Sequence, residues 1–228
     1  MFHEIAMGRA FAQCDGAVRT FSQNYSVVSE GDEIRRVYMV NSGMLRAFRF
    51  LSDGRRQITH FLFPNDLIGL IDNDSYSKSV ETVVQSKLTS LSQSKLQEFI
   101  SFNEGARLAL QKETRNLLRR SNSLQVILGR LSSVEKLSCF ILLLYQQKPL
   151  QQIVHIPMPR QDIADFLGMT VETVSRSFTR LRRLGLIVSR DPSSIKICSV
   201  SALQQVAGRF VLTGSPCRNV RAGISTNI

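Results

Sequence analysis

The sequence is poor in the residues that build metal centres, disulfide frames and catalytic clusters. Its 228 residues include four cysteines, three histidines and no tryptophan. The cysteines are widely separated, at Cys14, Cys139, Cys198 and Cys217. Because no two of them form a CxxC pair, the spacing favours reduced, cytosolic thiols over a disulfide frame or a zinc site. The histidines also stand singly, so neither a metal site nor a catalytic cluster is expected.

Long apolar runs are missing as well. The longest, Phe140 to Tyr145, is far shorter than the roughly 20 residues that a membrane helix needs. The N-terminal segment, Met1 to Ala10, carries Glu4 and Arg9 and has no long apolar core, so we expect no secretory signal. These absences predict a cytoplasmic protein that has no membrane partner.

Acidic residues are outnumbered by basic ones. The chain has 29 lysines and arginines against 18 aspartates and glutamates, a net charge of +11 at pH 7. Such a surplus favours polyanionic partners, above all nucleic acid, and argues against a calcium buffer. Hydrophobic residues make up 43% of the sequence, enough for one large or two small packed domains.

The first part of the chain has the pattern of a small β domain. Between Phe21 and Leu91, short apolar stretches alternate with turn residues. The turns are Glu30-Gly31-Asp32, Asn41-Ser42-Gly43, Ser52-Asp53-Gly54 and Pro64-Asn65-Asp66. A turn at intervals of roughly ten residues predicts an antiparallel barrel or roll. We therefore expect a β-roll domain over residues 1–103.

Residues 104–134 carry leucines at heptad spacing. The heptad positions are Leu110, Leu117, Leu124 and Leu131. Such a seam predicts a long helix that pairs with a parallel copy of itself, and therefore a homodimer. The alternative is a helix that packs by the same stripe on its own domain. The strongly basic other faces of the helix favour dimerisation. A second helix is expected from Ser133 to Gln147.

A helix-turn-helix is predicted between residues 160 and 184. Arg160 to Leu167 form a short amphipathic pattern, and Gly168 allows the left-handed turn that ends such a helix. Thr170 can then cap a second helix, Val171 to Leu184, through its side-chain oxygen. Two short helices joined by a glycine turn are typical of DNA-binding domains.

The second helix has one apolar face and one polar face. Val174, Phe178 and Leu181 are expected to pack inward. The outward stripe consists of Glu172, Ser175, Arg176 and Thr179. Arginine can fork to a guanine, and glutamate can accept from the amino group of a cytosine, so the stripe predicts base contacts in the major groove of double-stranded DNA. The alternative is a solvated face in which Glu172 and Arg176 form only a local ion pair.

A β-hairpin is expected after this helix, from Leu186–Val188 to Ile195–Ile197, as the wing of a winged helix. Arg190 lies in the hairpin and can contact phosphate there. We also assign DNA contacts to Arg160, Thr170 and Arg180. The winged helix-turn-helix domain is expected over residues 135–212, followed by a flexible tail at 213–228.

The order of β-roll, dimerisation helix and winged helix-turn-helix resembles the CRP/FNR family of bacterial transcription regulators. The resemblance extends from about residue 20 to residue 212. Its roll motifs are Glu30-Gly31-Asp32, Tyr38–Val40, Ser42-Gly43, Gly54-Arg55 and Phe63–Gly69. The helix-turn-helix is most similar to the FNR and FixK-type branch, whose E-x-x-S-R pattern is present as Glu172, Ser175 and Arg176.

This resemblance implies an α+β fold with an N-terminal antiparallel β-roll of the cyclic-nucleotide-binding kind. It also implies a homodimer that binds a palindrome of the TTGAT-N4-ATCAA kind and, as an activator, contacts RNA polymerase. The two recognition helices of such a dimer lie about 34 Å apart in successive major grooves.

The sensing half departs from the well-known members of the family. Cyclic-AMP binders use a Gly-Glu pair and an Arg-Ser pair, whereas this chain has Gly69-Leu70 and Lys78-Ser79. Oxygen sensors of the FNR type hold an iron–sulfur cluster with several N-terminal cysteines, but only Cys14 precedes residue 139. The resemblance is therefore to FixK, a regulator without a bound effector, and we expect no cofactor and no metal.

Three other interpretations compete with this one. The first keeps an effector in the roll, either haem or an anion near Lys78. The second is an enzyme, but the only clustered carboxylates, Asp66, Asp72 and Asp74, lie in turn-like sequence without a partner histidine. The third is a scaffold built on the leucine heptad, which leaves the stripe at residues 172–179 unexplained.

Overall fold

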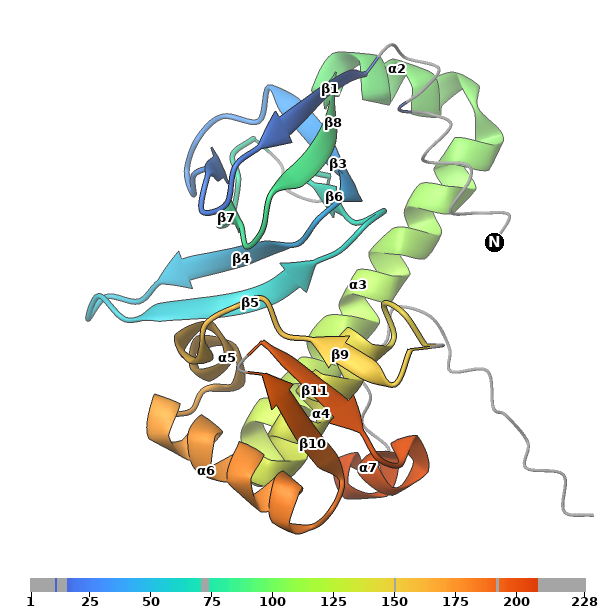
Figure 1. Ribbon diagram of the computed structural model, residues 1–228. Coiled ribbons are helices and arrows are strands. Elements are labelled where there is room, and N and C mark those ends of the chain that lie inside the picture. The colour runs from blue at the N-terminus through green and yellow to red at the C-terminus, as the bar shows by residue number, and fades with distance from the viewer. Residues whose placement is uncertain (1–10, 12–15, 71–73, 150, 192, 209–228) are drawn as a thin grey trace, which may run out of the picture.

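The computed structural model describes residues 11, 16–70, 74–149, 151–191 and 193–208, with the side chain of Arg190 left out. Figure 1 shows a β domain at one end, a winged helical domain at the other, and a long helix alongside both. The predicted α+β class is confirmed. The predicted tail at 213–228, Cys14 and Cys217 lie outside the described residues.

The β domain consists of two four-stranded antiparallel sheets. One sheet has the order β1-β8-β3-β6 and the other the order β2-β7-β4-β5. The strands are β1 (Ala17–Phe21), β2 (Ser26–Val28), β3 (Arg36–Ser42), β4 (Leu45–Phe50), β5 (Arg56–Leu62), β6 (Leu67–Ile68), β7 (Ser79–Thr82) and β8 (Ser86–Ser92). The turn at Gly43 requires glycine, because its φ is +102° and a Cβ there would lie 2.2 Å from Ser86 Oγ. The sequence thus predicted both the roll and the position of this turn.

Three helices follow: α2 (Gln93–Phe102), α3 (Glu104–Arg130) and α4 (Ser133–Tyr145). The expected helix over 104–134 is therefore too long. Leu131 is extended and ends α3, and Ser132 begins α4 through a capping box with Glu135. The Ser-x-x-Glu spacing is the local reason that the helix breaks there. Helix α2 was not expected, and α4 ends at Tyr145 rather than at Gln147.

The C-terminal domain has the predicted helix-turn-helix and wing. Its elements are β9 (Ile153–His155), α5 (Arg160–Leu167), α6 (Val171–Arg183), β10 (Ile187–Asp191), β11 (Ser194–Ile197) and α7 (Val200–Ala207). Strands β10 and β11 form the expected hairpin, and β9, which was not expected, pairs with β11. Helix α5 has the bounds that the sequence predicted.

One hydrophobic core joins the β domain to the C-terminal domain. The rings of Phe61 on β5, Phe140 on α4 and Phe166 on α5 meet with centroids 5.2 to 5.9 Å apart. Cys139, in the same core, is fully buried as predicted, and burial raises the pKa of its thiol to about 12. The two domains are therefore packed directly on each other. Among the described residues no helix combines the length and the apolar character needed to cross a membrane.

Candidate nucleic-acid interface

The helix pair α5–α6 is fixed by its own core. Ile163 and Leu167 of α5 are buried, and so are Val174 and Leu181 of α6, as the sequence predicted for these two. Gly168 closes α5 in the left-handed conformation, with φ of 60°. Thr170 then caps α6, its side chain accepting a hydrogen bond from the backbone N–H of Thr173. The outer face of α6 consequently has a defined direction.

That outer face carries the predicted stripe. Glu172, Ser175 and Arg176 are exposed, and Thr179 is partly exposed. Thr179 Oγ1 accepts a hydrogen bond of 2.9 Å from Arg182, so this side chain is already engaged. The structure thus brings the four residues onto one surface, with three of them open to solvent.

Glu172 is held in its charged form. Hydrogen bonds from its own backbone and from Thr170 lower the pKa of its carboxyl, and the charge of Arg176 contributes less. No ion pair within 4.0 Å joins Glu172 to Arg176, both of which lie in the described part of the chain. The local ion pair weighed as an alternative is therefore not formed.

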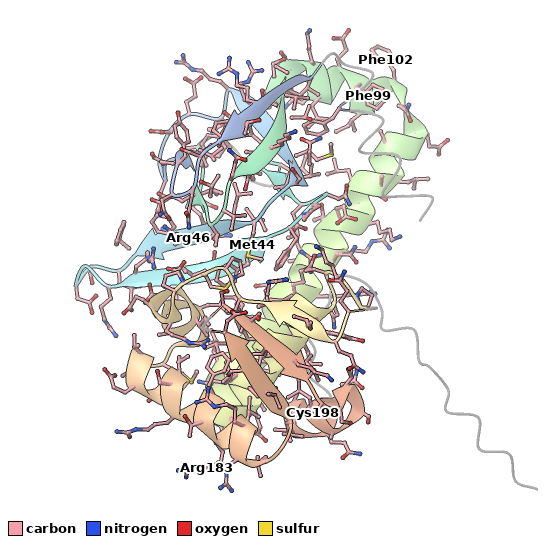
Figure 2. The ribbon with its side chains drawn as sticks, in the orientation of Figure 1. Met44, Arg46, Phe99, Phe102, Arg183 and Cys198 are labelled. Carbon is pink, nitrogen blue, oxygen red and sulfur yellow. The ribbon has the colours of Figure 1, made fainter. Side chains whose placement is uncertain are left out.

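The last turn of α6 supplies the positive charge. Arg180, Arg182 and Arg183 lie there, all exposed. Arg182 Nη1 donates to Ser189 of β10 at 3.1 Å, which ties the wing to the helix. Figure 2 shows Arg183 at the end of the molecule far from Phe102, on the outer side of α6. This end presents cations beside the polar stripe, as phosphate contact requires.

Two residues that we expected to contact DNA, Arg160 and Arg190, are not part of the stripe on α6. The Arg160 guanidinium is half-buried, 3.6 Å from the centroid of the Phe178 ring. Burial, and then the charge of Arg182, lower its pKa, and its Nη1 has no hydrogen-bond partner among the described residues. Arg190 lies in β10, but its side chain is outside the described residues.

The heptad leucines of α3 are divided between two environments. Leu110, Leu117 and Leu124 are partly buried, while Leu131 lies beyond the end of the helix. Leu124 and Leu131 pack against the core of their own chain. The most exposed leucine of the helix is instead Leu118, at 60%. Packing on the chain's own core, the alternative reading of the heptad, thus accounts for part of the seam.

A cavity of about 310 Å³ lies between the roll and α3. Its lining includes Gly69, Leu70, Lys78, Leu117 and Ser121. No carboxylate and no arginine occurs among its described lining residues. A cyclic nucleotide needs an acceptor for its ribose hydroxyl and a bidentate partner for its phosphate, so this lining does not fit that ligand.

Of the three aspartates considered for catalysis, Asp66 has a structural role, Asp74 makes a backbone hydrogen bond and Asp72 lies outside the described residues. Asp66 Oδ1 accepts from Arg120 of α3 at 3.0 Å, and its Oδ2 accepts from the backbone N–H of Phe63. The backbone oxygen of Asp74 accepts from Ile34, and Asp72 is not described. Asp66 therefore joins its turn to α3.

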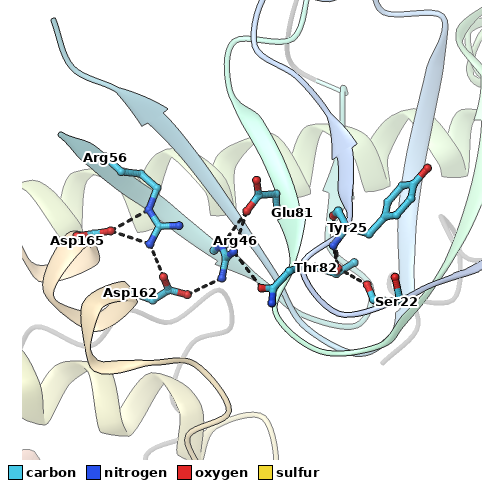
Figure 3. Close-up of polar contacts among 9 residues, drawn as sticks. Ser22, Tyr25, Arg46, Arg56, Glu81, Thr82, Asp162 and Asp165 are labelled. Atoms are coloured by element: carbon cyan, nitrogen blue, oxygen red, sulfur yellow. Dashed lines mark hydrogen bonds and ion pairs between the residues drawn. The ribbon is translucent and has the colours of Figure 1, made fainter. Parts of the chain in front are cut away.

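A group of charged side chains between the roll and α5 was not predicted from the sequence. It consists of Arg46, Arg56, Glu81, Asp162 and Asp165 (Figure 3). Burial lowers the pKa of Arg56, but the hydrogen bonds and charges of Asp165 and Asp162 outweigh it, and the pKa is raised. The available signal was the spacing of Asp162, Asp165 and Phe166 on α5, which places them on one face.

Comparison with known proteins agrees with this geometry. Residues 135–206 match the model of the Crp-like helix-turn-helix domain, and residues 18–103 match that of the cyclic nucleotide-binding domain. Together the two matches account for most of the chain.

Named relatives and a solved structure match over most of their length. The nitrogen fixation regulation protein FixK of Rhizobium meliloti is 32% identical over 83% of this chain and 86% of its own. The transcriptional activatory protein AadR of Rhodopseudomonas palustris is 34% identical over 72% of this chain and 70% of its own. The structure of FixK2 from Bradyrhizobium japonicum matches 85% of this chain and 98% of its own, with a TM-score of 0.80 and 26% identity. The chain therefore belongs to the CRP/FNR family of transcription regulators, as a relative of the FixK proteins.

Proposed function

We propose that the protein is a homodimeric transcription activator that binds a palindrome of the TTGAT-N4-ATCAA kind without a bound effector. The observation that carries this proposal is the exposed stripe of Glu172, Ser175 and Arg176 on a capped helix whose other face is buried. The relative AadR is a transcriptional activatory protein, which supports activation. An activator also needs a surface for RNA polymerase.

The stripe has the chemistry to read the half-site. Arg176 donates two hydrogen bonds to O6 and N7 of the guanine in TTGAT, and Glu172 accepts from N4 of the opposite cytosine. Ser175 bonds a base edge or a phosphate. The arginines at the end of α6 bind phosphates, which adds affinity for any sequence and makes binding weaken steeply with salt.

The second copy of the chain pairs along α3. Leu117 lies on the partly buried side of this helix and Leu118 next to it is exposed, so an apolar edge is left uncovered in one chain. A parallel partner helix covers such an edge. The twofold axis then sets the two α6 helices about one turn of DNA apart.

The cavity lining supports the effector-free state, because its described residues include neither the carboxylate nor the guanidinium that a cyclic nucleotide requires. A second candidate is a regulator that binds haem or a small anion in this cavity. The observation in its favour is the cavity itself, whose lining includes His60, Ser77, Lys78 and Thr114. A Soret band in the purified protein, or heat on titration with cyclic AMP, would favour this second candidate.

The decisive experiment is selection of bound sequences from a random duplex pool at physiological salt, with no ligand added. The expected result is enrichment of two inverted TTGAT half-sites separated by four base pairs. Enrichment of a sequence without twofold symmetry would contradict the dimer, and recovery of the input pool unchanged would contradict base recognition altogether.

A further inference from the structure

The contact between the roll and α5 has a feature that the DNA-binding surface does not use: a buried carboxylate shared by two arginines. We propose that Asp162 is a positioning residue, which fixes the direction of the recognition helix by holding α5 against strands β4 and β5. The inference rests on the proposed DNA-binding function. It names the contact that sets the spacing between the two half-sites that the dimer binds.

Both oxygens of Asp162 are used, each by a different strand. Arg46 Nη1, from β4, lies 2.8 Å from Oδ2. Arg56 Nη2, at the start of β5, pairs with Oδ1. Arg56 also pairs with Asp165, one turn further along α5, at 2.8 Å. Figure 3 shows the two arginines reaching from adjacent strands to one side of α5.

The arginines are themselves fixed within the roll. Glu81 of β7 accepts from Arg46 at 2.8 Å, and Asn24 Oδ1 accepts from the same guanidinium at 3.2 Å. Strands β4 and β5 are paired, with Phe50 opposite Arg56. Asp162 therefore meets donors whose positions are determined by the sheet and not by free side-chain rotation.

Burial makes these contacts directional and strong. The side chain of Asp162 is 1% exposed and that of Arg46 is 10% exposed. Exposed ion pairs are screened and contribute little, whereas a buried pair that loses one partner leaves an uncompensated charge. The neighbouring Phe61–Phe166 contact buries apolar surface, whereas the two charge-assisted contacts of Asp162 fix where its oxygens lie relative to β4 and β5.

The direction of α5 is passed to α6. The two helices share the buried side chains of Ile163, Leu167 and Val174, and Gly168 joins them in a tight turn. On its other side, the C-terminal domain continues from α3 through the extended backbone at Leu131 and Ser132, and Ile127 of α3 lies in the shared apolar core. Without the contact at Asp162, this joint, the apolar packing and the contacts of Arg56 and Gln57 with Asp165 would be left to set the angle between α6 and α3.

A loose angle has a specific consequence on DNA. Adding or removing one base pair between half-sites shifts and rotates the second half-site relative to the first, and only a rigid dimer rejects the change. Asp162 should therefore control discrimination between spacers more than affinity for a single half-site. This separates positioning from a contribution to stability alone.

The test compares full-length Asp162→Asn with the parent on three duplexes, TTGAT-N3-ATCAA, TTGAT-N4-ATCAA and TTGAT-N5-ATCAA, and on random duplex DNA, by fluorescence anisotropy. Asp53→Asn is the matched control, because Asp53 pairs with Arg55 within one exposed turn of the roll. We expect Asp162→Asn to reduce the preference for N4 over N3 and N5 by roughly tenfold or more while random-DNA binding is retained. Asp53→Asn should keep the parental preference.

Parental spacing preference in Asp162→Asn, or an equal loss of affinity on all duplexes, would overturn the positioning role. If the variant does not fold, the same comparison is made with Arg56→Gln, in which Asp162 keeps Arg46. Arg56→Lys should then restore part of the preference, and a parental preference in Arg56→Gln would overturn the proposal.

A measurement without DNA keeps the two proposals apart. Hydrogen exchange should become faster in α5 and β5 of Asp162→Asn and stay slow in α4 and α6. Unchanged exchange in α5 and β5 would overturn the positioning role whatever the DNA results. A parent that prefers none of the palindromes would overturn only the proposed function.

Discussion

Helices α6 and α3 both have apolar residues at regular helical spacing. This spacing correctly predicted the buried face of α6 but only part of the buried face of α3. The apolar residues of α6 face one core, and Val174, Phe178 and Leu181 are all buried where the sequence placed them. Helix α3 runs past two domains, and its leucines divide between a cavity, the core of the chain and solvent. A periodic stripe therefore specifies an inward face when the neighbours of a helix share one core, as α4 and α5 do beside α6.

The strongest test of this difference between α6 and α3 is whether α3 pairs with a second copy of the chain. We predict that Leu117→Glu gives a monomer and lowers affinity for the full palindrome by roughly a hundredfold or more, because each half-site is then bound independently. Sedimentation and anisotropy measure the two effects. Leu108→Glu is the control on the same helix, since Leu108 is exposed, at 48%, and lies on another side of α3. A dimeric Leu117→Glu would move the interface elsewhere.

The role of α6 in base recognition is tested by removing one guanidinium from its exposed face. Arg176→Ala should lose about 1–3 kcal/mol of discrimination for the guanine in each half-site, with binding to random duplex largely retained. Arg183→Ala, at the end of the same helix, should instead weaken binding to every duplex to a similar extent and reduce the salt dependence. Competition binding on matched and guanine-substituted palindromes distinguishes them. Equal loss on both duplexes for Arg176→Ala would mean that it contacts only phosphate.

An effect of pH on stability is expected beside α3, where His60 lines the cavity. Burial, then the charges of Lys78 and Arg120, lower the pKa of His60 to about 4. As pH falls from 6.5 toward 4, the unfolded histidine binds a proton and the folded one does not, so the protein loses up to about 3 kcal/mol of stability over that range. His60→Gln should lose less on the same acidification. Chemical denaturation at several pH values checks this, and identical pH slopes would contradict it.

The sequence predicted the helix-turn-helix closely because its signals are local. The bounds of α5, the left-handed Gly168 and the Thr170 cap all depend on neighbouring residues. The helix break at Leu131–Ser132 was also encoded locally, by Ser132 and Glu135, but the heptad pattern obscured it. Strand β9 was missed because three residues carry too weak a pattern, and it forms only by pairing with β11.

In the candidate site, too, local features were predicted from the sequence and long-range contacts were not. The exposed positions of Glu172, Ser175 and Arg176 follow from helical periodicity. The position of Arg160 could not be predicted from periodicity, because its half-buried guanidinium over Phe178 depends on how α5 packs on α6. Nothing in the local sequence of Arg46 or Arg56 indicates a partner more than a hundred residues away in α5.

By itself, the sequence determined the roll, the helix-turn-helix and the composition of the surface offered to DNA, since each depends on turn residues, caps and periodicity within a short segment. Only the tertiary structure decided how the C-terminal domain sits on the roll. That orientation comes from the buried contact of Asp162 with Arg46 and Arg56 and from the shared aromatic core. Both join segments that are distant in sequence, and such contacts form only when the chain has folded.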